Sequence, residues 1–315
     1  MVITDSPGGC YVILHVGNPP SHDTANDHWP PVVQDGSTRF DLSADIWIER
    51  LGQLAPKIQK ACEPPHYNYD PNKLPHNNLY AFVRRVPTDG GSKTQALEQL
   101  LGTVVLSRLI HPTSTGDRYL ARVFDFGGED SPIEAIERRG ISPDVFPGCK
   151  GQDWLSVDDA KELRTLMKWL SRDKAMHRRV RRALWNHEYA MRSCYLDVQW
   201  IFAVSGLEAM VNVGDKDNKW QFRDRVRQLA QEFRVALTDP DLSRAWDLRS
   251  KIVHAESFLS NLQTILPSTQ HRGLYEKLES VLRKTVYRCL MDESYGDCFR
   301  DAAAVKALLP LGPKP

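Results

Sequence analysis

The sequence predicts a mainly α fold, in which a C-terminal helical bundle follows a mixed N-terminal region, mostly helical with a few short strands. From residue 157 onward, apolar residues recur at the three- and four-residue spacing of amphipathic helices. Before about residue 150, short apolar runs are separated by stretches rich in Pro, Gly, Asn and Asp. A linker rich in Gly, Pro and acidic residues, roughly 140–153, separates the two parts.

The N-terminal region, residues 1–155, begins with irregular sequence around a strand-like run at 11–16. Ser43 is then expected to cap a helix, because the apolar residues after it follow a period near 3.6. Those residues are Ile46, Trp47, Leu51, Leu54 and Ile58.

Three further segments of this region have a recognisable pattern. Residues 79–86 fit either a strand or a helix, and residues 94–110 predict a helix that Pro112 ends. Residues 119–126 alternate enough to predict a strand.

The C-terminal part is expected to form a bundle over residues 156–295, followed by a disordered tail at 296–315 that ends in Pro- and Gly-rich sequence. The predicted helical segments are 158–171, 172–210 with one break, 219–237, 243–258 and 271–291.

The net charge of +1 conceals two halves of opposite sign. Residues 1–160 hold 14 Lys and Arg against 21 Asp and Glu, which leaves 27 against 19 for residues 161–315. The halves therefore carry about −7 and +8. A polyanionic partner would meet the second half, whereas the acidic first half suits a regulatory partner.

The six cysteines have no CxxC spacing, and neither a secretory signal nor a membrane-spanning run is evident. We therefore expect reduced thiols in a cytoplasmic protein that does not enter a membrane.

The most informative pair is Arg249 and His254, near the end of a predicted helix. Arg249 falls within the apolar stripe of that helix, three residues after Trp246 and four before Val253. Because a guanidinium keeps its proton when it is buried, Arg249 needs a carboxylate, a phosphate or a water-filled cleft beside it.

This segment resembles the HEPN domains, and among them the Apea-like HEPN group, in which an Arg precedes a His by four to six intervening residues. Here four residues intervene. The stretch 200–210, with Leu-Glu-Ala at 207–209, resembles the helix that precedes the motif in that family, and 271–291 resembles its closing helix. The resemblance covers roughly residues 160–292, about half of the chain. Ser250 departs from the pattern, since many catalytic members carry Asn, Asp or His at that position.

The resemblance implies a metal-independent endoribonuclease that needs no cofactor, with Arg249 and His254 contributed by two copies of a homodimer. Residues five apart on a regular helix differ by about 140° in direction, so one copy does not present both side chains to one phosphate. His254 would act as acid or base while Arg249 holds the phosphoryl oxygens. Other members act in stress responses or phage defence.

A structural interpretation competes with this one. Glu208 also lies on an apolar stripe, so Glu208 and Arg249 would form a buried ion pair that only stabilises the fold. Two alternatives to the nuclease therefore stand: a non-catalytic HEPN module that binds nucleotide or RNA or regulates a partner, and a helical assembly protein.

A basic stripe is expected along residues 161–182, which hold nine Lys and Arg against two acids. Its apolar residues should face the bundle, leaving the cations outside to contact an RNA backbone. Arg223, Arg225 and Arg227 would add to it, and a solvated basic surface is the alternative. The residues expected to bind RNA are Arg172, Lys174, Arg178, Arg179, Arg181 and Arg182.

No metal site is expected. His66, Asp70 and His76 share a loop, but their spacing matches no known ligand pattern. The Gly-Gly pairs lack the Lys-Ser/Thr or GxGxxG order of nucleotide-binding loops.

Overall fold

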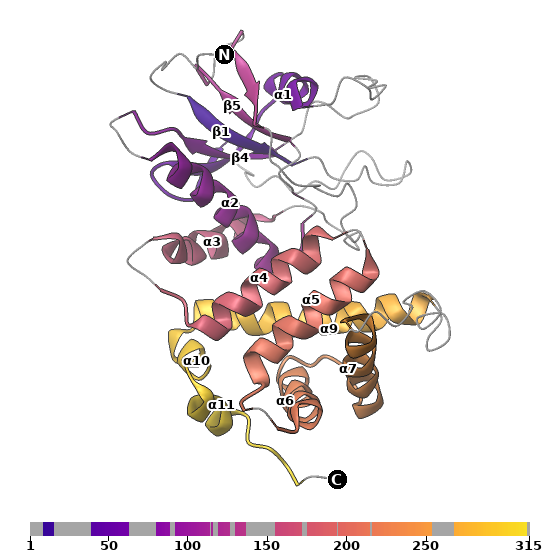
Figure 1. The fold of residues 1–315 in the computed structure, drawn as a ribbon. Coiled ribbons are helices and arrows are strands. Elements are labelled where there is room, and N and C mark those ends of the chain that lie inside the picture. The colour runs from indigo at the N-terminus through magenta and orange to yellow at the C-terminus, as the bar shows by residue number, and fades with distance from the viewer. Residues whose placement is uncertain are drawn as a thin grey trace. The chain divides into compact units, whose positions relative to one another are not determined.

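The computed structural model divides the chain into two compact units, residues 1–172 and 173–315 (Figure 1). It describes residues 9–15, 39–62, 80–88, 92–113, 115, 119–126, 130–136, 155–171, 175–193, 195–214, 216–253 and 268–313. The predicted fold class is confirmed: the molecule is mainly α, with a helical second unit and short strands in the first. The strands form a single sheet, which the sequence did not predict.

The sheet has six antiparallel strands in the order β2-β3-β4-β1-β5-β6. Their bounds in chain order are β1 Cys10–Leu14, β2 Arg39–Asp41, β3 Ile46–Arg50, β4 Tyr80–Arg85, β5 Leu120–Val123 and β6 Ile133–Ala135. In the centre, Val12 lies opposite Val83 on β4 and Ala121 on β5. Every residue of β1 is buried, so both faces of the sheet centre are covered.

Two helices supply that cover. The side chains of Val12 and Leu14 share one core cluster with Ala55 and Ile58 of α1 (Leu54–Cys62). Helix α2 (Lys93–Ile110) packs on β4 and β1, and Ser92 caps its first turn by accepting a hydrogen bond from Gln95 N at 3.2 Å. The helix predicted at 94–110 is therefore confirmed, and so are strands within 11–16 and 119–126; residues 79–86, which fitted either a strand or a helix, contain strand β4.

The helix predicted from Ser43 is wrong over residues 46–50, which form strand β3. Ser43 instead stabilises the β2–β3 turn, where its Oγ accepts a hydrogen bond from Ile46 N at 3.1 Å. Apolar residues at 46–48 suit a buried strand as well as a helix, and pairing with β2 and β4 decides between them. The helix begins only at Leu54.

The boundary between the units lies later than the predicted 155/156. Helix α3 (Val157–Leu166) and the 3-10 turn Met167–Leu170 belong to the first unit, because both pack against α2. A capping box of Ser156 and Asp159 starts α3. The apolar side of this segment thus completes the first unit rather than the bundle.

The second unit is a bundle arranged around α5 (Figure 1). Its helices are α4 Arg178–Arg192, α5 Leu196–Val211, α6 Asn218–Glu232, α7 Asp239–Val253, α9 Ser268–Met291, α10 Glu293–Asp297 and α11 Ala302–Leu308. Helix α5 contacts α4, α6, α7 and α9, and it is the most apolar of them, with Trp200, Leu207 and Met210 almost fully buried. Helices α4 and α5 lie side by side across α9 (Figure 1).

Gly206 allows α5 to approach its neighbours closely. A Cβ atom at this position would lie 2.7 Å from Leu282 Cδ2 of α9 and 3.2 Å from Asn186 Cβ of α4. Both distances are shorter than ordinary van der Waals contacts. A larger residue at position 206 would therefore require the Leu282 side chain to move where the three helices meet.

The prediction of a disordered tail at 296–315 is wrong for the described residues, 296–313. Phe299, Val305 and Leu309 are buried, and α11 lies within the segment. Arg225 Nε donates a hydrogen bond to Leu309 O at 2.9 Å, and Gly312 N donates one to Asp224 Oδ2 at 3.1 Å. Buried apolar side chains and these two contacts hold a segment whose Pro and Gly content alone predicted disorder.

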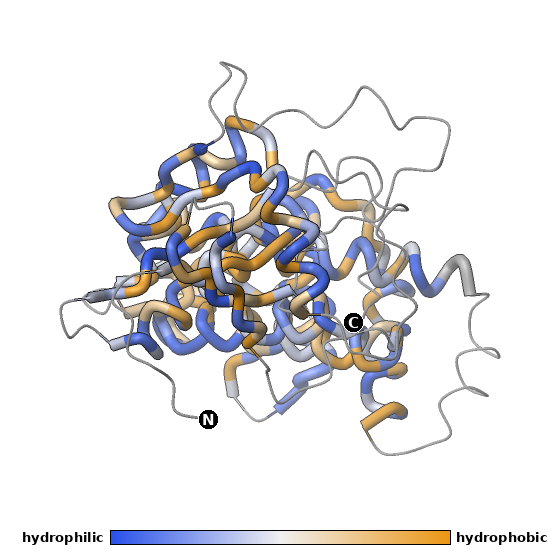
Figure 2. The backbone as a smooth tube through the Cα atoms, turned by 90° about the horizontal axis from the view of Figure 1, so that it is seen from above, coloured by the Kyte–Doolittle hydropathy of each residue, from blue (hydrophilic) through white to orange (hydrophobic). Residues whose placement is uncertain are grey.

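Two of the cysteines in the described part are buried, Cys10 in the sheet and Cys289 on α9, and neither forms a disulfide. Burial raises the pKa of the Cys10 thiol to about 11 and that of Cys289 well above its usual range. Among the described helices, none has the length and apolar character needed to cross a membrane. Hydrophobic and hydrophilic residues instead alternate along the helices (Figure 2).

Candidate functional site

Arg249 of α7 and Glu208 of α5 form an ion pair, with Arg249 Nη2 3.0 Å from Glu208 Oε2. The pair belongs to the α5–α7 contact, which also contains a hydrogen bond of 3.1 Å from Trp200 Nε1 to Ala245 O. The side chains of Arg249 and Glu208 remain 28% and 15% exposed. The predicted partnership of Arg249 and Glu208 is confirmed, and the pair is half-buried.

Glu208 lies between cations from two helices. Burial raises the pKa of Glu208, while the positive charges of Arg249 on α7 and Arg182 on α4 lower it. Arg182 therefore extends the charged cluster from α5 towards α4. The sequence interpretation did not associate Arg182 with Glu208.

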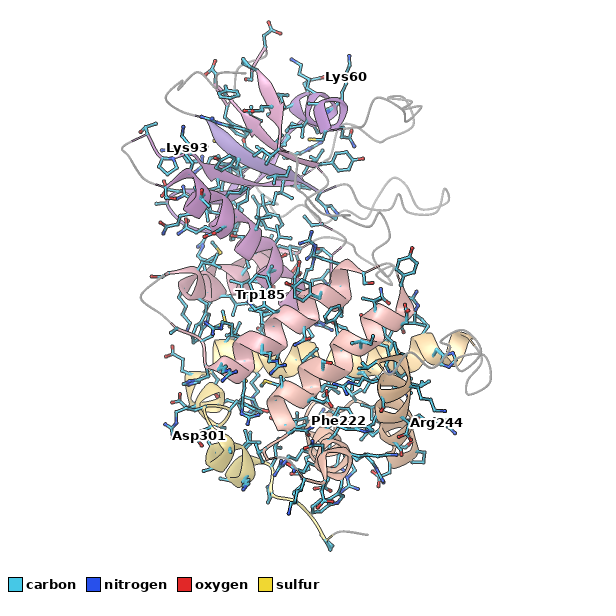
Figure 3. All side chains as sticks on the ribbon, in the orientation of Figure 1. Lys60, Lys93, Trp185, Phe222, Arg244 and Asp301 are labelled. Carbon is cyan, nitrogen blue, oxygen red and sulfur yellow. The ribbon has the colours of Figure 1, made fainter. Side chains whose placement is uncertain are left out.

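An aromatic pair lies beside the guanidinium group of Arg249. Its Cζ is 6.0 Å from the centroid of the Trp246 ring, which packs at 5.3 Å against Phe222 of α6 (labelled in Figure 3). No contact of the described residues engages Arg249 Nη1, and Nε is buried without a partner among them. Arg249 thus retains donors beyond the one directed at Glu208.

Of the other two predicted site residues, the structure describes only Ser250. Ser250 is half-buried on α7 beside Arg249. His254 lies outside the described residues, since the described part of α7 ends at Val253. The meeting of Arg249 with His254 from a second copy stays a prediction.

The predicted basic stripe at 161–182 is not one helical face, because the segment is shared by the two units. On α3, Lys161 pairs with Asp158 at 2.8 Å, and Arg164 donates to Asp41 O and lies over Phe40. Those cations serve the first unit. Arg172 and Lys174 lie outside the described residues.

Arg179, also predicted to bind RNA, is engaged within the protein. It is half-buried, and its Nη1 donates hydrogen bonds of 2.9 Å to Ala209 O and to Asn212 O at the C-terminal end of α5. Carbonyls in the last turn of a helix have no partner within the helix, so Arg179 satisfies them.

The three arginines of α6 expected on the basic surface are likewise engaged within the protein. Arg225 is buried and its Nη1 donates to Val211 O at 2.7 Å. Arg223 and Arg227 both pair with Asp239 of α7. None of them is free to supply a cation to a nucleic acid.

Arg178, Arg181 and Arg182 remain as exposed cations of α4. Their side chains form no ion pair or hydrogen bond within the described part of the chain. The same side of α4 carries two exposed aromatic residues, Trp185 and Tyr189, which the sequence interpretation missed. Trp185 follows Arg182 by three residues and Arg181 by four, and Tyr189 follows Trp185 by four, so this spacing was the available signal.

Comparisons with family models, curated proteins and solved structures give no match for this chain. The site must therefore be interpreted from its own geometry.

A second feature belongs to the first unit. A cavity of about 370 Å³ adjoins the N-terminal end of α2, lined by Arg84, Arg85 and Gln99 among others. Arg84 already donates to Gln99 Oε1 and Arg85 O, and it lies 3.6 Å from Asp45. This arginine is therefore committed to the protein itself.

The structure offers no grouping of metal ligands within its described ranges. The loop residues considered from the sequence, His66, Asp70 and His76, lie outside those ranges.

Proposed function

We propose that this chain acts on RNA as a HEPN-type, metal-independent endoribonuclease in which Arg249 binds the scissile phosphate. One observation carries the proposal. The two stretches that resemble the family, Leu207–Ala209 on α5 and the segment from Arg249 on α7, come together in space through the Arg249–Glu208 ion pair. Their contact supports a shared site.

The chemistry follows from the groups available. A base removes the proton of a ribose 2′-OH, whose oxygen attacks the adjacent phosphorus. The 5′-oxygen then leaves with a proton from an acid, which yields a 2′,3′-cyclic phosphate and a 5′-OH end. A guanidinium fork stabilises the charge that accumulates on the phosphoryl oxygens. His254 serves as acid or base, and Arg249 supplies the fork.

Glu208 is a positioning residue in this proposal. Its ion pair with Arg249, in which Glu208 Oε2 lies 3.0 Å from Nη2, holds the guanidinium in place while Nη1 stays available for phosphate. Because Arg249 and His254 are about 140° apart on a regular helix, two copies of the chain complete one site. The acidic first half would regulate it through a partner, and a cytoplasmic role in stress or phage defence fits such an activity.

The same ion pair favours a second candidate. If the interaction only stabilises the α5–α7 contact, the chain is a non-catalytic HEPN module that binds RNA or nucleotide or regulates a partner protein. The two candidates differ in whether Arg249 and His254 are needed for cleavage beyond their effect on folding.

Cleavage of a labelled single-stranded RNA in EDTA tests the proposal. The full chain should give products ending in 2′,3′-cyclic phosphate, and His254→Ala should reduce the rate by about 10²-fold or more, since one acid–base group contributes 10²–10⁴-fold. Lys251→Ala, in the same helical turn, is the matched control and should cleave normally. Circular dichroism should be the same for all three proteins.

The structural contribution of the pair is removed in a double variant, Glu208→Leu with Arg249→Met. Replacing a buried pair with apolar residues is often neutral for stability, so this variant should stay folded yet lose cleavage. A folded double variant or a His254→Ala variant that cleaves at the wild-type rate would sink the nuclease proposal.

A further inference from the structure

One face of α4 carries arginines and aromatic rings together. We define the α4 stripe as Arg178, Arg181, Arg182, Trp185 and Tyr189, all of them exposed. At about 100° per residue, these five positions fall within an arc of about 100° around the helix. From Arg178 to Tyr189 the stripe extends about 16 Å along the axis, at about 1.5 Å per residue.

The aromatic part of the stripe is a short stack of rings. Trp185 and Tyr189 are 50% and 52% exposed, although such residues are usually mostly buried. Their ring centroids are 6.3 Å apart at 33°, and Tyr189 continues the series at 5.2 Å and 33° to Phe202 of α5. Figure 3 labels Trp185 on α4. Trp185 and Tyr189 thus form a half-exposed aromatic patch that continues to Phe202.

The basic part of the stripe carries unbalanced positive charge. Within the described part of the chain, Arg178, Arg181 and Arg182 have no hydrogen-bonded or ion-paired acid, unlike Arg179 one position away. Arg182 acts on Glu208, which also pairs with Arg249, so positive groups continue from the stripe to the candidate site.

A molecule that binds the α4 stripe must have two properties. It must bring negative charge to the arginines and flat, exposed π-faces to the rings. Single-stranded nucleic acid has both, whereas a duplex hides its base faces in the stack. A second copy of this chain, packed face to face about a two-fold axis, would add three more uncompensated arginines and gain repulsion.

We propose that the α4 stripe is a docking surface for single-stranded RNA, with bases stacked on Trp185 and Tyr189 and phosphates held by the arginines. The proposal rests on the proposed action on RNA and names the form of its substrate. It concerns binding, which is measured separately from cleavage.

The test measures fluorescence anisotropy of a labelled, unstructured 12-nucleotide RNA with the full chain in EDTA. All proteins carry His254→Ala, so that the probe stays intact. Stacking of one base on one ring is worth 1–3 kcal/mol, so Trp185→Ala should weaken binding roughly 5- to 150-fold. Trp185→Phe keeps a ring and should restore most of the affinity. Tyr195→Ala, an exposed tyrosine before α5, is the matched control and should bind as the parent does.

The arginines are tested by salt dependence. The plot of log K against log salt falls with a negative slope. In the double variant Arg181→Gln with Arg182→Gln this slope should become shallower by about 1.4, because each phosphate contact on a single strand contributes about 0.7. Arg244→Gln, on exposed Arg244 of α7, is the control (Figure 3). A duplex of the same sequence should bind more weakly and should not respond to Trp185→Ala.

Three results would overturn the proposal: unchanged affinity in Trp185→Ala, equal losses for single strand and duplex, or a dimer without RNA that Trp185→Ala dissociates. The last would assign the stripe to contacts between copies. Wild-type chain that binds single strands through the stripe but never cuts them would end the nuclease proposal alone. Wild-type chain that cuts RNA while Trp185→Ala binds normally would end the docking proposal alone.

Discussion

The two faces of helix α4 use similar side chains for opposite purposes. On the inner face, His187 Nε2 lies 2.9 Å from Glu279 Oε1 of α9, and Arg179 binds backbone carbonyls of α5. On the outer face, Arg178, Arg181 and Arg182 have no such partners in the described structure. A count of basic residues therefore does not give the charge that a helix presents to solvent. Neighbouring residues are about 100° apart around the helix axis, and this difference in direction decides whether an arginine contacts protein or solvent.

The largest expected effect comes from the inner face. Glu279→Gln should lower the free energy of unfolding by about 3–5 kcal/mol at neutral pH, because it removes the charged partner of His187 and Arg283. Chemical denaturation measures the loss. An unfolding free energy equal to that of the wild type would mean that the inner network does not hold the bundle.

The same variant has a pH signature. Burial raises the pKa of Glu279, but the His187 hydrogen bond and the charge of Arg283 outweigh it and hold the pKa below the usual 4.5. The stabilisation from ionised Glu279 is therefore complete above pH 4.5 and is lost as the pH falls through the lowered value. The difference between wild type and Glu279→Gln should narrow below that pH. A constant difference from pH 7 down to pH 3 would contradict this origin.

Adjacent arginines test the comparison directly. Arg179→Ala should cost about 1–3 kcal/mol of stability, since two carbonyls at the end of α5 lose their donor. Arg178→Ala, one residue earlier, should stay within about 0.5 kcal/mol of wild type. Equal melting temperatures for the two variants would contradict the view that only arginines on the inner face of α4 stabilise the fold.

The smallest effect on stability belongs to the aromatic residues of the outer face. Trp185→Ala should change the free energy of unfolding by no more than about 0.5 kcal/mol, because Trp185 is already 50% exposed and lies on the outer face of α4. A loss above about 2 kcal/mol in denaturant titration would place Trp185 among the structural residues of the bundle.

Local patterns predicted the helical segments well, because the apolar stripes of α5, α7 and α9 have the helical period. The contact between Glu208 and Arg249 was predictable for the same reason, since both charged residues interrupt apolar stripes. In contrast, Ile46–Trp47–Ile48 fits both a strand and a helix, and pairing with distant strands decided the outcome. Local periodicity carries no information about such partners.

The remaining errors concern what surrounds a residue. Arg225 belongs to a basic run in the sequence, yet it is buried and bound to Val211 O. The Pro- and Gly-rich end near Leu309 and Gly312 was expected to be disordered, but Arg225 and Asp224 bind its backbone. Trp185 and Tyr189 have the spacing of core residues, so only the fold distinguishes them from the core.

Two buried thiols, one in each unit, can report local opening of the structure. Cys10 lies in the sheet of the first unit and Cys289 on α9 of the second, and each must become solvent-accessible and ionised before it reacts with an alkylating reagent. Modification at either position, identified by mass spectrometry, therefore records how often that unit opens. One alkylating reagent would thus measure the local opening of each unit separately.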